Sequence, residues 1–439
     1  MFYTEMKIIK TKTALICYDI SCKGNDYESS EEGDRMKYVN GSEVLPEELV
    51  RMIQRYVQGK YVYIPKQEEE KKNWGANTGY RNELAKRDSH IYRKYLEGIP
   101  IIQLGNYYHL SSPSIRRIIL KKKKEYEAVD RKIKEILNNW DIQGEVKQIY
   151  SSAWSVSEEY VIKVYSEQSS MNRNIIILKT LHQTGIPVAE VLPTNTGRDY
   201  CEDGENYYVM TRRLPGSNLG SLGQEPKEIC FRMGSVIGRL HLAFQKCEEE
   251  LTFWDNSLLK EMTGWVRESL KESEWRYVRE EEYHQAVTKL QSVYDGLPRQ
   301  LIHRDVHLGN FLFDKNVFSG YIDFDLSQKN IRIFDIAYFL LGILSEEGNN
   351  DIDRELWFDL VGETVRGYEE QLRLTDEEKE ALAVVMQCIE LLFTAYFFSI
   401  KDEKCAEDAA GLFRFAVINE RKMRDRLISD NLLTVAEKR

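Results

Sequence analysis

Four polar residues lie in the stretch LIHRDVHLGNFLFDKNVFSGYIDFD (residues 301–325), which constrains the fold more than any other part of the chain. They are His303, Asp305, Asn310 and Asp323, each next to a short apolar run. Two interpretations are open from this pattern alone. Either the polar residues decorate loops between core strands, or the strands hold these side chains in a cleft.

The apolar runs FLF (311–313) and YIDF (321–324) predict a β-hairpin that brings Asn310 and Asp323 together. Transfer of a phosphoryl group needs one residue that orients the attacking hydroxyl and accepts its proton, and others that hold magnesium against the phosphate oxygens. Asp305 can do the first. The amide oxygen of Asn310 and the carboxylate of Asp323 are the hard oxygen ligands that magnesium prefers.

A single Asp in a loop is usually a cap or turn residue, and a single His is usually structural. Four such residues in register around a hairpin favour the cleft instead. Arg304 and His307 differ, because loop packing and substrate contact are equally compatible with their positions.

Length and composition indicate a soluble protein of two or three domains, since the chain has 439 residues, 42% hydrophobic and 30% charged. No apolar run of about eighteen residues stands out as a membrane span, and the start is a poor signal peptide. The seven cysteines form no CxxC pair, so we expect a reduced, cytoplasmic protein without a structural zinc.

Charge is distributed unevenly along the chain. Residues 36–135 carry 21 Lys and Arg against 13 Asp and Glu, whereas the whole chain has a net charge of −10. A basic module joined to an acidic one predicts two different partners, one of them a polyanion. The acidic, glycine-containing segment 24–35 predicts a flexible lead-in over residues 1–35, with Met36 as an alternative start.

Residues 36–135 have a mostly helical pattern, with helices predicted at 46–60 and 79–98. The segment 99–127 predicts a short helix, a tight turn and a second helix capped by Ser111 or Ser112. Residues 36–125 resemble a small family of bacterial helix-turn-helix proteins. A helical connector with a solvated lysine run is the alternative; if DNA is bound, a homodimer is expected, because a single copy binds weakly. The candidate DNA contacts are Ser114, Arg116, Arg117 and Lys121.

The pattern changes near residue 141. Two strands joined by a small-residue turn are predicted in 146–166, a helix in 173–187 and a strand in 207–216, with long helices beyond. Strands followed by helices predict an α+β domain of two lobes with a cleft between them. The predicted parts are therefore a lead-in (1–35), a helical module (36–135), the two-lobed domain (141–425) and a tail (426–439).

HRDVHLGN with IDFD resembles the aminoglycoside phosphotransferase and choline kinase-like family, distant relatives of protein kinases. The resemblance covers about residues 141–425 and implies a bilobal protein kinase-like fold with ATP or GTP and Mg²⁺ as cofactors. It implies a catalytic Asp305, metal ligands Asn310 and Asp323, a bracing His303 in the catalytic loop, and Asp335 as a support for that loop.

The resemblance also implies a nucleotide site. Lys163 in YVIKVY lies where the family has a lysine that pairs with the α- and β-phosphates. The helix acid that pairs with this lysine falls at Asn174, so the ion pair is either missing or supplied by Glu167. The phosphate loop SSAWS, with Ser151 and Ser152, lacks the Gly-x-Gly-x-x-Gly pattern, although backbone N–H groups can still hold phosphate. The segment from Met210 to Arg213 is expected to bear the adenine.

A small-molecule acceptor is expected rather than a protein, because Asp325 replaces the glycine of the protein-kinase metal motif and no A-P-E segment follows. In aminoglycoside kinases, acids of the helical lobe bind amino groups of the substrate. An aminated sugar or amino alcohol is therefore expected, unless the acids here only form solvated helix faces. The acids in question include Glu346, Glu347, Asp351, Asp353 and Asp359.

Taken together, these patterns predict an N-terminal helix-turn-helix module joined to a nucleotide- and magnesium-dependent small-molecule kinase. The alternative is a DNA-binding transcription regulator whose kinase-like domain senses a ligand without turnover. Retention of Lys163, Asp305, Asn310 and Asp323 argues against a sensor, which has no need of a base.

Overall fold

The computed structural model describes residue 51 and residues 78–96, 98–250, 256–315, 317–345 and 352–427. The expectations for the lead-in, for the helix at 46–60 (Arg51 apart) and for most of the tail lie outside these residues. The chain divides into two compact units, residues 24–131 and residues 1–23 with 132–439.

The first unit contains helices α4 (Thr78–Leu96) and α5 (Ile101–Tyr107), and most of α6 (Ser112–Ile136). The predicted short helix, turn and second helix are confirmed, and the Oγ of Ser111 accepts a hydrogen bond from the N–H of Ser114 (3.3 Å) at the start of α6. A small core ties the three helices together; it consists of Ile91, Tyr92, Leu104, Ile115, Ile118 and Ile119.

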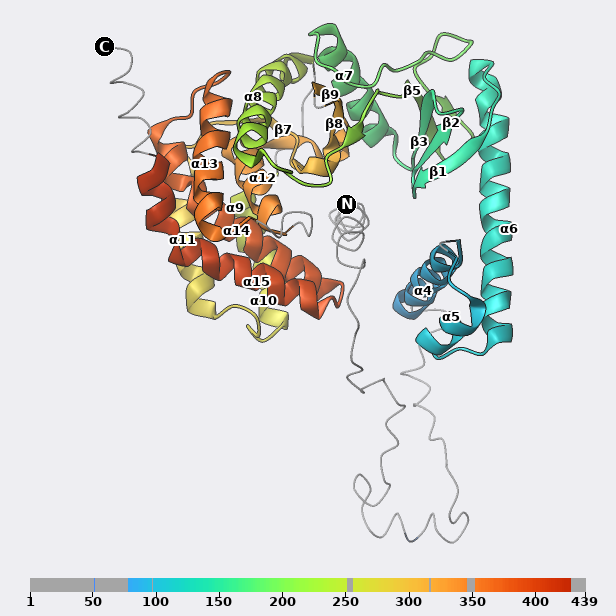
Figure 1. Cartoon of the computed structure of the whole chain (residues 1–439), viewed down its shortest axis with the longest axis horizontal. Coiled ribbons are helices and arrows are strands. Elements are labelled where there is room, and N and C mark those ends of the chain that lie inside the picture. The colour runs from blue at the N-terminus through green and yellow to red at the C-terminus, as the bar shows by residue number, and fades with distance from the viewer. Residues whose placement is uncertain are drawn as a thin grey trace. The chain divides into compact units, whose positions relative to one another are not determined.

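Within the second unit, a five-stranded antiparallel sheet forms one lobe, in the spatial order β1-β2-β3-β5-β4 (Figure 1). Its strands are β1 (Val146–Tyr150), β2 (Ala153–Val156), β3 (Tyr160–Tyr165), β4 (Cys201–Glu202) and β5 (Tyr207–Arg212). The expectation of two strands in 146–166 was wrong, because Ser157 and Glu158 both have positive φ (50° and 60°) and turn β2 into β3. Neither residue is the Gly or Asn that usually marks such a turn, so the sequence carries no clear signal for it.

Helix α7 (Gln168–Gln183) follows β3, and Gly185, with a φ of 77°, follows the residue that caps its C-terminus. This C-terminus agrees with the predicted helix end at Gly185. Ile175 and Met171 of α7 pack against Val209 of β5, so the helix covers one face of the sheet.

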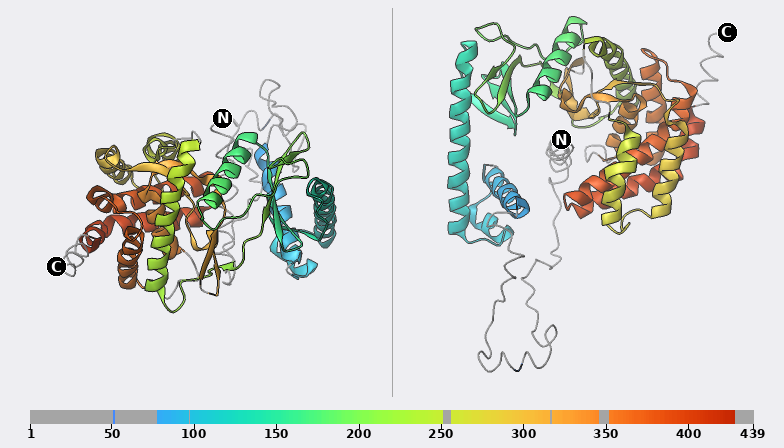
Figure 2. Two further views of the ribbon diagram at one scale, coloured as in Figure 1. Left: turned by 90° about the horizontal axis from the view of Figure 1, so that it is seen from above. Right: turned by 180° about the vertical axis from the view of Figure 1, so that it is seen from behind.

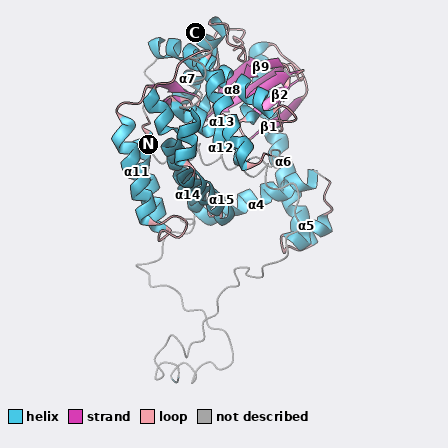
Figure 3. Ribbon diagram, turned by 60° about the vertical axis from the view of Figure 1, so that its left-hand side comes forward, coloured by secondary structure: helices cyan, strands magenta, loops and turns pink. Residues whose placement is uncertain are grey.

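The remaining helices build the second lobe of this unit, and the lobes are distinct in each view of Figure 2. Most strands gather at one side of the unit in Figure 3. Helices α8 and α13 pack so closely that a side chain at Gly234 or Gly367 would collide with the backbone of the opposite helix. The two glycines permit this close approach. The helices are α8 (Pro226–Glu250), α9 (Leu258–Glu261), α10 (Arg267–Glu272), α11 (Glu280–Tyr294), α12 (Ile333–Ser345), α13 (Arg354–Glu369), α14 (Asp376–Ser399) and α15 (Glu403–Ile418).

Helix α14 is long and apolar enough to cross a membrane by length and composition, contrary to the expectation that no such segment stands out. Its most apolar window is 89% buried inside the protein. Thr375 and Glu378 form a capping box at its start, and Glu378 also binds Arg332 with two contacts of 2.7 Å. These features are those of a core helix of the helical lobe.

The motif region forms the predicted hairpin, β8 (Phe311–Asp314) with β9 (Val317–Tyr321). β7 (Arg299–Ile302) pairs with β10 (Gln328–Ile331), and β6 (Ser217–Asn218) pairs with β8. Asn310 immediately precedes β8, and its carbonyl accepts a hydrogen bond from the N–H of Ile322 (3.1 Å). The hairpin therefore brings Asn310 next to the segment that carries Asp323.

Candidate active site

Asp305 lies in the loop between β7 and β8 and is only 1% exposed. One carboxylate oxygen accepts a hydrogen bond from the Tyr338 hydroxyl of α12 (2.9 Å), and the other accepts one from Nδ2 of Asn310 (3.0 Å). Nδ2 of Asn310 also donates to the carbonyl of Asp305 (2.8 Å). The carboxylate is thus held in one orientation from two sides.

His303 connects the two halves of the motif. Its Nε2 donates to the carbonyl of Ile322 (3.0 Å), and its Nδ1 accepts from the N–H of Asp305 (3.3 Å). The ring therefore links the loop of Asp305 to the residue just before Asp323. Both ring nitrogens are thus used within the protein.

Asp335 at the start of α12 binds the backbone of the loop that carries Asp305. Its carboxylate accepts hydrogen bonds from the N–H groups of His303 and Arg304, both at 2.8 Å. It also contacts Nε2 of His241 (2.9 Å), whose Nδ1 lies 2.8 Å from the Tyr368 hydroxyl. Charge-assisted bonds in a fully buried setting hold a loop more firmly than neutral ones do.

For Arg304 the sequence is compatible with either loop packing or substrate contact, and in the structure its side chain packs inside the protein. It adopts a left-handed backbone conformation (φ 68°), and its guanidinium donates to both carboxylate oxygens of Glu261 at 2.8 Å. Both side chains are more than nine-tenths buried. The pair anchors the catalytic loop to α9, which favours loop packing for this residue.

His307 faces Asp305, with Nε2 3.8 Å from a carboxylate oxygen, while Nδ1 accepts from the N–H of Gly309 (3.1 Å). Burial by itself raises the pKa of Asp305, but the interactions of its carboxylate with His307 outweigh burial and hold the pKa below its usual range. Asp305 is therefore ionised at neutral pH, as an acceptor of the hydroxyl proton must be.

The residues expected to bind metal present oxygen atoms only. Because Nδ2 of Asn310 donates to Asp305, the amide oxygen is the atom left for a cation. Asp323 follows β9 in a left-handed conformation (φ 64°, ψ 65°), and its side chain is 29% exposed. An amide oxygen and a carboxylate fit magnesium, which usually takes one or two protein ligands and completes its shell with water and phosphates.

Lys163 reaches across from β3 to the motif region. Its Nζ lies 3.1 Å from Oδ1 of Asp323 and 2.6 Å from Oδ1 of Asp325. Nδ2 of Asn174, on α7, donates to the same oxygen of Asp325 (2.7 Å). Burial acts to lower the pKa of Lys163, but the two carboxylates raise it well above its usual range, so the ammonium stays charged. The expected pair with a helix acid is therefore missing, Glu167 does not supply it, and Lys163 pairs with Asp323 and Asp325 instead.

The predicted phosphate loop is shorter in the structure. Ser151 and Ser152 form the turn between β1 and β2, whereas Ala153, Trp154 and Ser155 lie on β2 and are buried. The carbonyl of Ser152 accepts from the N–H of Val164 (2.8 Å), next to Lys163. Of the predicted loop, only the two residues Ser151 and Ser152 are outside a strand.

The residues expected to bear the adenine lie at the end of β5. Met210 is completely buried, and its carbonyl accepts from the N–H of Leu192 (2.9 Å). Arg213 is exposed, and its N–H donates to the carbonyl of Glu159 (2.8 Å). Both backbone groups are therefore already used within the sheet.

The candidate DNA contacts lie on the first half of α6. Arg116, Arg117 and Lys121 are exposed, and Ser114 is partly exposed, with its Oγ 2.9 Å from that of Ser111. Part of the lysine run is paired along the helix, since Lys121 lies 3.8 Å from Glu125.

The acids considered for an amino group have structural partners where the structure describes them. Asp353 caps α13 by accepting from the N–H of Leu356 (2.7 Å). Asp359 pairs with Lys227 and Arg426, each at 2.7 Å. Glu346, Glu347 and Asp351 lie outside the described residues.

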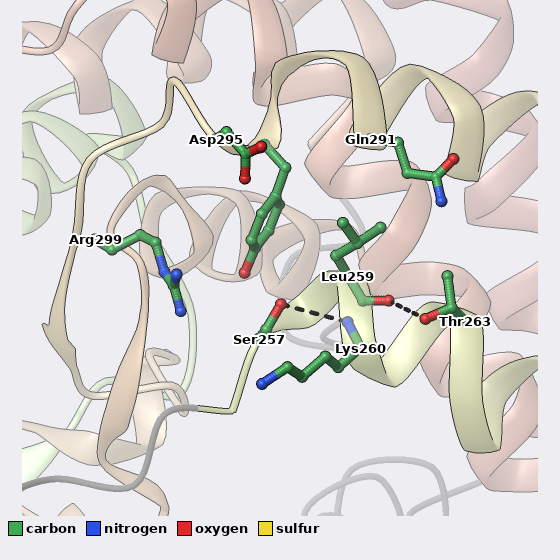
Figure 4. A pocket seen from close by; sticks show the side chains of 8 residues that line it. Ser257, Leu259, Lys260, Thr263, Gln291, Asp295 and Arg299 are labelled. Atoms are coloured by element: carbon green, nitrogen blue, oxygen red, sulfur yellow. Dashed lines mark hydrogen bonds between the residues drawn. The ribbon is translucent and has the colours of Figure 1, made fainter.

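A separate pocket of about 340 Å³ lies between α9, α11 and the start of β7 (Figure 4). Its polar lining includes Lys260, Gln291, Asp295 and Arg299, and the Thr263 hydroxyl donates to the carbonyl of Leu259 (2.9 Å). None of the predicted site residues lines it.

Several site residues were not found from the sequence. Tyr338, His241 and Tyr368 lie far from the motif along the chain, and only Tyr338, three residues after Asp335 on α12, carries a positional signal. Asp325 was noted only as a replacement for glycine, although its spacing from Asp323 could have marked it as a second carboxylate for Lys163.

Comparison with known proteins first defines the class. The fold is that of a solved amicoumacin kinase (16% identity, 69% of this chain and 96% of that one, TM-score 0.52) and of a microcompartment-associated aminopropanol kinase (17%, 67% and 98%, TM-score 0.50). This is the bilobal, kinase-like α+β fold predicted from the sequence.

The family follows from the sequence match. The chain belongs to the phosphotransferase enzyme family, whose model matches residues 147–382, more than half of its length. A homoserine kinase of Methylobacillus flagellatus is 26% identical over 215 residues, 45% of this chain and 61% of that protein. A hydroxylysine kinase of Danio rerio is 25% identical over 269 residues, 55% and 73%. An uncharacterized Bacillus subtilis protein, YraL, is 42% identical over 87 residues, 20% of this chain and all of that protein.

Proposed function

We propose that the protein transfers the γ-phosphoryl group of ATP or GTP, with Mg²⁺, to a hydroxyl of a small molecule. The observation that carries this proposal is the grouping around the hairpin of an ionised carboxylate, an amide oxygen, a second carboxylate and a lysine. These are the groups that phosphoryl transfer requires, in the four positions expected from the sequence.

Asp305 receives the acceptor. Its buried carboxylate, ionised and fixed by Tyr338 and Asn310, orients the hydroxyl and takes its proton as the bond to phosphorus forms. Asn310 and Asp323 hold magnesium, which neutralises charge on the phosphate oxygens when it is bound. Lys163 binds the α- and β-phosphates, and the backbone of the turn at Ser151 and Ser152 covers them.

For the nucleotide base, we propose a contact just beyond the expected segment. Because the Met210 carbonyl and the Arg213 N–H already have partners, we place the adenine contact beyond Arg213, where β5 leads toward β6. The solved amicoumacin kinase of this fold is in complex with AMP-PNP, and the assay below distinguishes ATP from GTP for this protein.

An amino alcohol or hydroxy amino acid is the acceptor class that we propose. The homoserine and hydroxylysine kinases are named for substrates that carry both a hydroxyl and an amino group. This chain spans 61% of the homoserine kinase, so its own acceptor is inferred from the class and not from that protein. The proposal places the protein in the cytoplasm, where nucleotide and magnesium are available.

The test is phosphate transfer from ATP and from GTP to a panel of homoserine, hydroxylysine, aminopropanol, choline and aminoglycosides. Asp305→Asn keeps the shape of the side chain but removes the base, and we expect it to lower kcat by about 10²- to 10⁴-fold. Omission of magnesium should abolish transfer in the native protein. Nucleotide binding without transfer to any acceptor would contradict the proposal and favour a ligand sensor.

We also propose that the helical module binds DNA, which would make the protein a regulator as well as an enzyme. Exposed Arg116, Arg117 and Lys121 on one helix after a tight turn support this; the pairing of Lys121 with Glu125 opposes it. Fluorescence anisotropy with duplex DNA at two salt concentrations tests the proposal, and Arg116→Ala/Arg117→Ala should weaken binding and reduce the salt dependence. Sedimentation in the same buffer reports whether a homodimer is the binding form.

A further inference from the structure

We propose that Asp325, oriented by Asn174, is the positioning residue that keeps Lys163 on the nucleotide phosphates while Asp323 binds the metal. The proposal rests on the phosphotransferase function proposed above. It gives Asp325 a role of its own beside the metal ligand, and it explains why α7 can carry an amide in place of an acid.

The contacts differ between the two carboxylates that share Lys163. The ammonium lies 2.6 Å from Asp325 and 3.1 Å from Asp323. Asp325 is the less exposed of the two, with 13% of its side chain exposed against 29% for Asp323. Asp325 is also bonded to α7, through Nδ2 of Asn174 (2.7 Å), a residue that is itself 5% exposed. Asp325 is therefore the fixed partner, and Asp323 is the partner that can leave.

Charge balance gives the same division of roles. Lys163 and one carboxylate cancel, which leaves the second carboxylate with its full negative charge for a divalent cation. An acid at position 174 would place a third carboxylate beside Asp323 and Asp325. The neutral amide of Asn174 avoids this repulsion and still fixes Asp325, because it donates to the same oxygen that Lys163 contacts.

The backbone supports the distinction. Asp325 lies in the short 3₁₀ helix Phe324–Leu326, directly after the left-handed residue Asp323, and both carboxylates lie within 3.1 Å of Nζ of Lys163. Asn174 and Lys163 come from the strand lobe and Asp325 from the motif region. The hydrogen bonds of Asn174 and Lys163 to Asp325 therefore connect these two parts of the protein. A residue in this place acts on the phosphates through Lys163 and touches no reacting atom.

The experiment moves the carboxylate that binds Lys163 from position 325 to position 174 on α7. Asp325→Asn should raise the Kd of a fluorescent ATP analogue, measured with Mg²⁺, by at least about 10-fold, and lower kcat by up to about 100-fold through misplacement of Lys163. The KM for the acceptor should stay unchanged. The double variant Asn174→Glu/Asp325→Asn restores an acid next to Lys163 and should recover most of the nucleotide affinity. Asp199→Asn, which breaks the Lys179–Asp199 pair on the surface of the same lobe, is the matched control.

Two results would overturn the proposal. One is an Asp325→Asn variant with native nucleotide affinity. The other is a loss of affinity that accompanies a lower unfolding temperature and is not recovered by Asn174→Glu, since that pattern describes a merely structural residue. The binding assay needs no acceptor, so a failure of the proposed function, namely nucleotide binding without transfer in the native protein, is seen separately.

Discussion

Glu390 is a buried acid in the middle of α14 from which a strong pH dependence of stability follows. Its side chain is 3% exposed, and its carboxylate has no hydrogen bond or ion pair with any residue in the described part of the chain. Burial raises the pKa of Glu390 from 4.5 to about 8, with no compensating charge. The native protein therefore keeps this carboxyl protonated at neutral pH, whereas the unfolded chain ionises it.

The sign and size of the effect follow from linkage. Between pH 4.5 and about 8 the native state binds one more proton at Glu390 than the unfolded state, so the free energy of unfolding falls as the pH rises through this window. Each pKa unit corresponds to about 1.4 kcal/mol, so the full difference amounts to about 5 kcal/mol. Below pH 4.5 both states are protonated and the contribution of Glu390 to the pH dependence is absent.

Glu390→Gln removes the titration and keeps the shape of the side chain. We expect the variant and the native protein to unfold at similar urea concentrations at pH 5, and the variant to be more stable by several kcal/mol at pH 9, on the scale of about 3 to 5 kcal/mol. Tryptophan fluorescence in urea at pH 5, 7 and 9 measures this. Glu380→Gln, at an exposed position of the same helix, should leave the pH profile unchanged. An equal stability difference between Glu390→Gln and the native protein at pH 5 and pH 9 would refute the reasoning.

Three further predictions concern the catalytic loop. Tyr338→Phe removes the hydrogen bond to Asp305 and should lower kcat by about 10-fold, with little change in the KM for nucleotide, as steady-state kinetics will show. His307→Gln removes the main interactions that hold the pKa of Asp305 down, so the acid limb of the kcat profile should move to higher pH; an unmoved limb would show that another group sets it. Glu261→Gln leaves Arg304 without its buried carboxylate and should cost about 3 to 5 kcal/mol of stability in chemical denaturation. A change below 1 kcal/mol would mean that Arg304 finds water or another partner.

The local elements around the motif could be predicted because their signals are local. Alternating apolar residues on either side of a turn predict the hairpin, and the hairpin by itself explains why Asn310 and Asp323 come together. The helix of Ser112 was predicted for the same kind of reason, since a serine just before an amphipathic run is a cap signal. These parts of the fold need no information about distant segments.

The missed features depend on distant segments. Asn174 stands at a position where an acid was expected, and nothing near it in the sequence says that Asp325, 151 positions away, replaces that acid. The hydrogen bonds of Met210 and Arg213 likewise depend on residues 192 and 159, which are not their neighbours in the sequence. Residue type and spacing do not determine such pairings, because each requires the folded lobe.

The support of Asp305 shows why catalytic precision cannot be assigned to the motif alone. His303 and Arg304 carry the loop, but the carboxylate that holds their backbone is Asp335, and His241 and Tyr368 in turn hold Asp335 from α8 and α13. Every residue of this hydrogen-bond network is buried. Removal of a side chain distant from Asp305 therefore leaves an unsatisfied polar group as well as a less firmly held loop. The catalytic geometry is therefore a property of the helical lobe as a whole, and a change at Tyr368 should alter kcat although that residue contacts neither nucleotide nor acceptor.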